Sequence, residues 1–112
     1  DLERFYRVLG LVFERHRHDN GPEHLAAQPY RDGSVFEIYP ANKKAGATTG
    51  VRIGFSIDAV DSYLAKLVEA GGSIVQPACD SEWGRRAVVT DPDGHKVELV
   101  TPLNRTEKIN NR

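Results

Sequence analysis

The chain has 112 residues and a mass of 12.4 kDa, enough for one domain with a modest core and too little for separate cofactor and substrate domains. Lysine plus arginine number 15 and aspartate plus glutamate 16, so the net charge of −1 argues against a protein that binds nucleic acid or acidic lipid. No apolar run approaches the roughly 20 residues of a membrane-spanning helix, so a membrane protein is not expected.

The first part of the chain predicts one helix followed by three strands. A helix is expected over residues 1–9 because four apolar residues share one face at helical spacing: Leu2, Phe5, Tyr6 and Leu9. Strands are expected over residues 11–18, 23–28 and 34–39, which lie between turn residues. The last of these is rich in the β-branched and aromatic residues that strands prefer.

After a small, polar linker at residues 41–50, the sequence predicts a strand, a helix and three further strands. The strand at 51–57 leads to a helix that Asp58 is expected to cap. An apolar stripe marks the buried face of that helix: Val60, Tyr63, Leu64, Leu67 and Val68. The remaining strands are expected over residues 73–76, 85–90 and 96–101, with a loop at 77–84 before the second of them.

Two segments repeat one pattern of turn, strand and proline. DGSVFEIYP at residues 32–40 aligns with DGHKVELVTP at residues 93–102, which places Glu37 and Glu98 at equivalent positions. The repeat predicts a single domain, 1–112, with a first module at 1–40, a linker at 41–50, a second module at 51–102 and a loose tail at 103–112. The second module has a strand before its helix, and the chain has no methionine, so the matching strand of the first module is expected upstream.

At these residues the sequence resembles the vicinal oxygen chelate superfamily, the group of glyoxalase I, bleomycin-resistance proteins and extradiol dioxygenases. The matching stretches, in order, are FYRVLGL at 5–11, VFEIYP at 35–40, IGFSID at 53–58, WGRRA at 83–87 and DPDGHKVEL at 91–99. The resemblance implies an α+β fold of paired βαβββ modules, whose curved, mostly antiparallel sheet surrounds a cavity with the helices outside. It also implies a homodimer.

Metal-using members of that superfamily hold a divalent ion with side chains from the first and fourth strands of each module. The matching positions here are Glu37, Glu98 and Arg52. A guanidinium has no lone pair to give a metal, and two carboxylates alone suit a transition metal poorly. We therefore expect no metal cofactor; Glu37 and Glu98 are the candidate ligands if a divalent metal is used after all.

Strand alternation places Glu37, Arg52 and Glu98 on the sides that face the expected cavity. We hypothesise that Arg52 replaces the charge of the ion and pairs with Glu37, Glu98 or both, because a buried carboxylate without a partner is costly. Two interpretations stay open: a structural ion pair, and a cluster that contacts a ligand.

Three further residues are candidates for ligand contact. His24 follows Gly-Pro and could face the cavity as a base, or be a packed imidazole. Trp83 and Tyr39 could form aromatic walls for a flat or cationic molecule, or pack on the edge of the core. His95 follows Asp-Pro-Asp-Gly and is interpreted as a turn residue.

These features favour a metal-independent small-molecule binder of the resistance or sequestration type. The alternatives are a metal-dependent lyase, isomerase or dioxygenase, and an oligomeric scaffold without a ligand, since one fold hosts many functions. The expected partners are a small molecule and a second copy of the chain, without nucleic acid or membrane. One cysteine, Cys79, cannot form an internal disulfide, so the cytoplasm is the expected compartment.

Overall fold

The structure, a computed structural model, describes residues 1–17, 19–28, 35–40, 48 and 50–103. The expected linker at 41–50 and tail at 103–112 therefore lie almost entirely outside the described residues. No helix in the described ranges is long and apolar enough to cross a membrane.

The first module consists of a helix and a three-stranded antiparallel sheet. The helix α1 spans Leu2–Val8, and the strands are β1 (Glu14–His16), β2 (His24–Ala27) and β3 (Phe36–Ile38), in the order β1-β2-β3. The predicted helix and all three strands are confirmed, although β1 and β3 are shorter than expected. The expected leading strand would precede residue 1 and stays a prediction.

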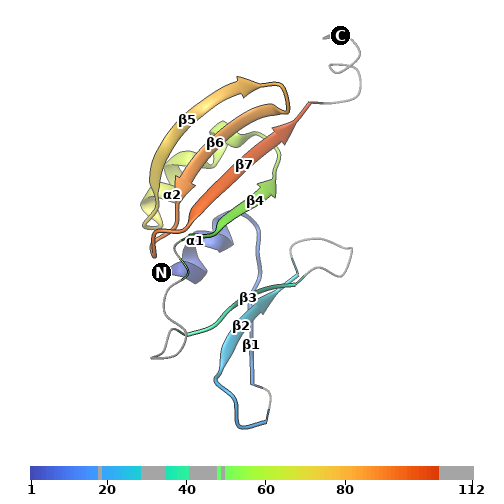
Figure 1. The fold of residues 1–112 in the computed structure, drawn as a ribbon, viewed down its shortest axis with the longest axis vertical. Helices are drawn as coiled ribbons and strands as arrows, with labels where there is room; N and C mark the ends of the chain where they lie inside the picture. The colour runs from blue at the N-terminus through green and yellow to red at the C-terminus, as the bar shows by residue number, and fades with distance from the viewer. Residues whose placement is uncertain (18, 29–34, 41–47, 49, 104–112) are drawn as a thin grey trace.

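The second module has the βαβββ order that the sequence predicts. Its elements are β4 (Arg52–Ser56), a 3-10 turn η1 (Val60–Ser62), α2 (Leu64–Glu69), β5 (Ser73–Ser81), β6 (Gly84–Thr90) and β7 (Lys96–Pro102). The strand order is β4-β7-β6-β5, with β4 parallel to β7 and the other pairs antiparallel. This four-stranded sheet is curved, as Figure 1 shows.

The start of the second helix differs from the prediction. Asp58 does not cap α2, because Ala59 adopts a left-handed conformation with φ of 52° and the chain forms η1 before the α-helix begins. The Asp58 carboxylate instead accepts a hydrogen bond of 2.7 Å from the Tyr63 hydroxyl. That bond raises the pKa of the Tyr63 hydroxyl.

The prediction of a short strand at 73–76 and a loop at 77–84 is wrong. A single strand, β5, runs from Ser73 to Ser81, and only Glu82 and Trp83 form the turn to β6. Pro77 is tolerated because β5 is an edge strand, and its register with β6 shifts on both sides of Gln76.

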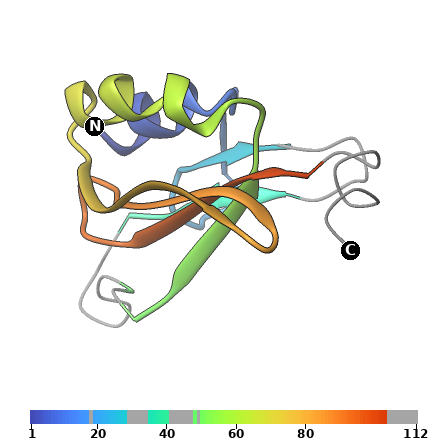
Figure 2. The ribbon, with the colours of Figure 1, turned by 90° about the horizontal axis from the view of Figure 1, so that it is seen from above.

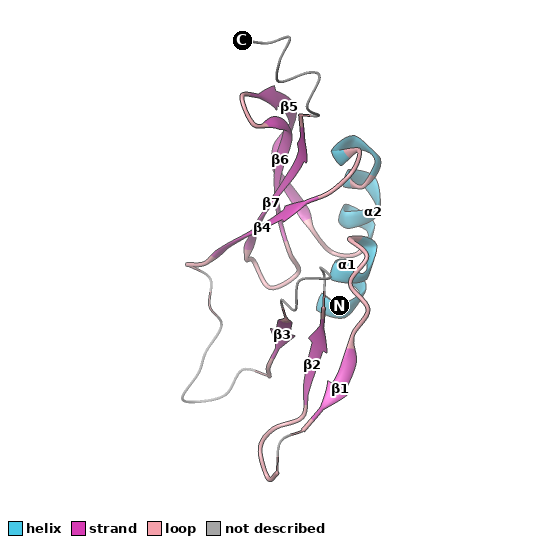
Figure 3. Cartoon of the chain, turned by 90° about the vertical axis from the view of Figure 1, so that its right-hand side faces the viewer, coloured by secondary structure: helices cyan, strands magenta, loops and turns pink. Residues whose placement is uncertain are grey.

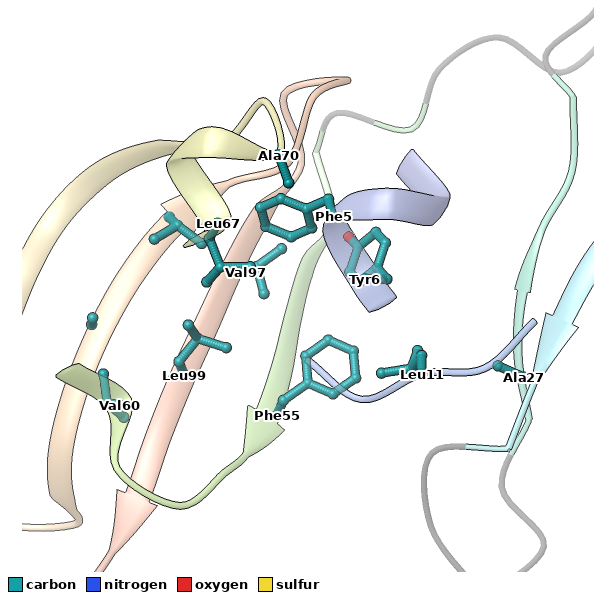
Figure 4. Packing of buried hydrophobic residues seen from close by; sticks show 12 residues of the cluster. Phe5, Tyr6, Leu11, Ala27, Phe55, Val60, Leu67, Ala70, Val97 and Leu99 are labelled. Carbon is teal, nitrogen blue, oxygen red and sulfur yellow. The ribbon is translucent and has the colours of Figure 1, made fainter. Parts of the chain in front are cut away.

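The core joins the two modules through α1. Phe5 and Tyr6 are 0% and 1% exposed, and the Tyr6 ring lies 4.9 Å from Phe36 of the first sheet and 6.1 Å from Phe55 of the second, measured between ring centroids. Figure 4 shows Phe5 directed toward Ala70, the residue that follows α2. Both helices lie on one side of the second sheet (Figures 2 and 3), and the side of this sheet away from the helices is called its open face below.

Candidate functional site

The open face of the second sheet carries two of the predicted site residues. The alternation expected for β4 is confirmed: Ile53 and Phe55 face the core, whereas Arg52 is exposed. On β7, Val97 and Leu99 are fully buried and Glu98 lies between them on the opposite face. Arg52 and Glu98 therefore share the open face of this sheet.

Glu98 lies between two guanidinium groups. Arg86 Nε donates a hydrogen bond of 2.7 Å to Glu98 Oε1, and Arg52 Nη1 lies 3.8 Å from Glu98 Oε2. The Arg86 side chain is 16% exposed and that of Glu98 28% exposed, so the tighter of the two pairs is partly shielded from solvent. The expected contact between Arg52 and Glu98 is present, with Arg86 as a stronger partner.

The carboxylate of Glu98 and the guanidinium groups beside it each stabilise the charged form of the other. The hydrogen bond from Arg86 lowers the pKa of Glu98 most, and Arg52 lowers it further. Glu98 in turn raises the pKa of Arg86. Arg86 Nη1 also donates to Gln76 Oε1 at 3.3 Å, so the guanidinium bridges β7 and the edge strand β5.

The side chains around Glu98 do not fit a divalent cation. Both carboxylate oxygens of Glu98 face a guanidinium, and a metal ion here would meet two positive charges at close range. Glu37, the other carboxylate that the resemblance implies as a ligand, contacts a histidine of its own module instead.

We expect the ion pair of Glu98 to contribute to stability in a pH-dependent way. Because its pKa is lowered from 4.5 in the folded state, its contribution is present above about pH 4.5 and is lost as the pH falls through the folded pKa. Glu98→Gln should therefore reduce stability at pH 7 and flatten its fall in acid, measured by urea unfolding between pH 7 and pH 3. Glu82→Gln, at an exposed carboxylate for which the described residues show no ion pair, is the control and should leave the curve unchanged. A Glu98→Gln curve parallel to that of the unmodified chain would contradict this.

The first sheet brings three other predicted residues together. His24 Nε2 lies 3.1 Å from Glu37 Oε2, and the imidazole stacks on the Tyr39 ring with centroids 4.1 Å apart and planes 10° apart. The His24 side chain is 1% exposed, so this residue is packed into the sheet. Among the described contacts, Glu37 pairs with His24 and not with Arg52.

A cavity of about 340 Å³ lies where the two modules meet. Its apolar walls come from α1, β3 and β4, and its polar wall includes Glu37 and the turn from Asp91 to His95. Tyr39 lines this cavity and also a neighbouring one of about 300 Å³ that contains His24. Of the six predicted site residues, Glu37, Tyr39 and His24 thus lie at the junction of the modules.

The other three predicted residues lie elsewhere. Arg52 and Glu98 lie on the open face of the second sheet and line neither junction cavity. Trp83 is at the tip of the β5–β6 hairpin, 63% exposed, and also lines neither of them. A role for these three in binding stays a prediction.

Sequence reasoning missed a buried carboxylate in the polar wall of the cavity. Asp91 is 3% exposed and accepts hydrogen bonds from the Tyr6 hydroxyl (2.7 Å) and from the backbone N–H groups of Asp93 (2.9 Å) and His95 (3.0 Å). His95 Nδ1 lies 2.9 Å from the same carboxylate. Burial, together with the bond to Asp91, raises the pKa of the Tyr6 hydroxyl. The DPDGH motif and a tyrosine on the buried face of α1 were the available signals.

Comparison with family models gives a match over most of the chain: the Glyoxalase/Bleomycin resistance protein/Dioxygenase superfamily matches residues 3–99. A search of curated proteins finds no match.

Several solved structures share the fold. The hypothetical protein SA1046 from S. aureus is 22% identical, with a TM-score of 0.72 over 89% of this chain and 82% of its own. TnmS3, an antibiotic binding protein from Streptomyces sp. CB03234, is 20% identical, with a TM-score of 0.70 over 91% and 84%. A glyoxalase-related enzyme from Fulvimarina pelagi is 24% identical, with a TM-score of 0.64 over 91% and 81%. At these identities the likeness concerns the fold.

Proposed function

The chain belongs to the glyoxalase/bleomycin resistance protein/dioxygenase superfamily, and we propose that it binds a small organic molecule at the junction of its two modules without a metal ion. The observation that carries metal independence is the pairing of Glu98 with Arg86 and Arg52. Two guanidinium groups already neutralise the carboxylate that a metal would need.

The junction cavity supports binding of a small, flat molecule. Aromatic and aliphatic side chains form most of its wall, with a few polar groups at one end, which is the usual composition of a ligand site. The apolar part includes Tyr6, Phe36, Ile38 and Ile53. Its volume of about 340 Å³ suits a molecule of two or three fused rings. TnmS3, an antibiotic binding protein, shares the fold, and this agrees with a binding role for the present chain.

We expect metal ions to have no effect on binding. Protein treated with EDTA should take up no stoichiometric Ni²⁺, Zn²⁺ or Mn²⁺ in isothermal titration calorimetry, and the affinity for an aromatic probe should be the same with and without added metal. The double variant Arg52→Gln with Arg86→Gln is the matched comparison, because it exposes the Glu98 carboxylate to a cation.

Two results would overturn the proposal. One is stoichiometric ion binding that is lost in Glu37→Gln and Glu98→Gln. The other is turnover of a substrate that depends on added metal, which would favour the lyase, isomerase or dioxygenase alternative.

We also propose that the protein is a cytoplasmic homodimer. Apolar side chains are exposed just before β4, on β5 and just after β3, including Val51, Val75 and Tyr39, each about half exposed. A second copy could cover part of this area. Sedimentation equilibrium tests the assembly: a mass equal to a single chain of 12.4 kDa would remove the dimer from the proposal.

A further inference from the structure

We infer that His95 Nε2 is the hydrogen-bond acceptor of the junction cavity, so that the site selects neutral aromatic molecules that carry an O–H or N–H donor. The inference rests on the proposed binding function and specifies the class of ligand.

The tautomer of His95 follows from its contact with Asp91. Two backbone N–H groups and the Tyr6 hydroxyl donate to this buried carboxylate. Because all of these groups donate, the Asp91 carboxylate is the acceptor here, so His95 Nδ1, 2.9 Å from it, carries the proton of their contact. In a neutral imidazole the other nitrogen, Nε2, then holds the lone pair and is an acceptor.

The protein itself supplies a hydroxyl to this lone pair. Thr48 Oγ1 lies 3.0 Å from His95 Nε2, and with the imidazole in this neutral tautomer the threonine hydroxyl is the donor. Thr48 and His95 both line the junction cavity. A ligand hydroxyl that entered the cavity could therefore take the place of Thr48 on His95.

The charge of the cavity wall favours the same class of ligand. Besides His95, its titratable polar side chains are those of Glu37, Asp91, Asp93 and two tyrosines, and no lysine or arginine of the described residues lines it. The wall thus presents hydrogen-bond acceptors and negative charge. It favours a ligand group that donates a hydrogen bond, and it repels a carboxylate or phosphate. The His95 side chain is 14% exposed, so a bond to it is partly shielded from water.

The test compares three probes of one shape: 2-naphthol, 2-methoxynaphthalene and 2-naphthoate, by isothermal titration calorimetry at pH 7.5. We expect 2-naphthol to bind about tenfold more tightly than the ether, since one shielded hydrogen bond separates them, and the anionic naphthoate to bind most weakly. In Thr48→Val, which removes the competing hydroxyl, affinity for 2-naphthol should rise while that for the ether stays the same. In His95→Phe, which keeps a flat ring without an acceptor, the preference should vanish.

A second measurement needs no variant. In the unmodified protein, the ¹⁵N resonances of the His95 imidazole should show a protonated Nδ1 and an unprotonated Nε2, and 2-naphthol should shift the Nε2 resonance. Equal binding of 2-naphthol and its ether, tighter binding of naphthoate, or a proton on Nε2 of the neutral ring would overturn the inference and leave the proposed function standing. Failure of all three probes to bind would overturn the proposed function at this cavity, and the inference with it.

Discussion

Replacing Asp91 with alanine is expected to lower the free energy of unfolding by about 3–5 kcal/mol. The substitution removes the shared acceptor of the Tyr6 hydroxyl, of the His95 imidazole and of two backbone N–H groups in a turn. Tyr6 is 1% exposed, so water cannot readily replace the lost partner of its hydroxyl. Urea unfolding followed by circular dichroism measures the change.

Asp93 provides the matched control, since it lies in the same turn and its side chain is exposed. Asp93→Ala should change the free energy of unfolding by no more than about 0.5 kcal/mol. A loss below about 1 kcal/mol in Asp91→Ala, or similar losses in both variants, would show that the buried carboxylate does not hold this region together.

Gly84→Ala is expected to destabilise the protein by about 3 kcal/mol or more, for steric reasons. Gly84 begins β6 with φ of +132°, a conformation that side chains disfavour, and a Cβ there would lie 2.1 Å from the carbonyl oxygen of Thr101. Because β6 pairs with β7 at this point, relief of the clash requires the two strands to separate. Thermal unfolding measures the loss.

Gly54 in the same sheet distinguishes this effect from the general cost of replacing a strand glycine. An added Cβ at Gly54 meets no atom within 4 Å, so Gly54→Ala should be neutral or stabilising by up to about 0.5 kcal/mol. Equal destabilisation by the two substitutions would contradict the steric argument.

Local patterns in the sequence predicted most of the fold. On β4 and β7, apolar residues alternate with polar ones, and the structure buries Phe55 and Leu99 while leaving Arg52 exposed. The length of β5 could not be predicted in this way. Its residues are exposed along most of the strand because it lies at the edge of the sheet, so Pro77 and Asp80 resemble a loop.

The candidate site was less predictable, because it depends on register between strands. Val88 is the partner of Glu98 across β6 and β7, which places Arg86 two residues away on the same face and within reach of the carboxylate. No pattern within one strand contains that information. The link from Asp91 to Tyr6 likewise joins residues 85 positions apart, which only packing of α1 brings together.

Strand β5 also bears on how the protein avoids uncontrolled association. It leaves one backbone edge of the second sheet open, with Ile74 and Val75 about half exposed, a combination that can recruit strands of other chains. Pro77 has no N–H to offer an incoming strand, and the uneven register around Gln76 breaks the regular ladder that such a strand would need. The same proline that made this segment resemble a loop would therefore act as its safeguard against fibril-like stacking.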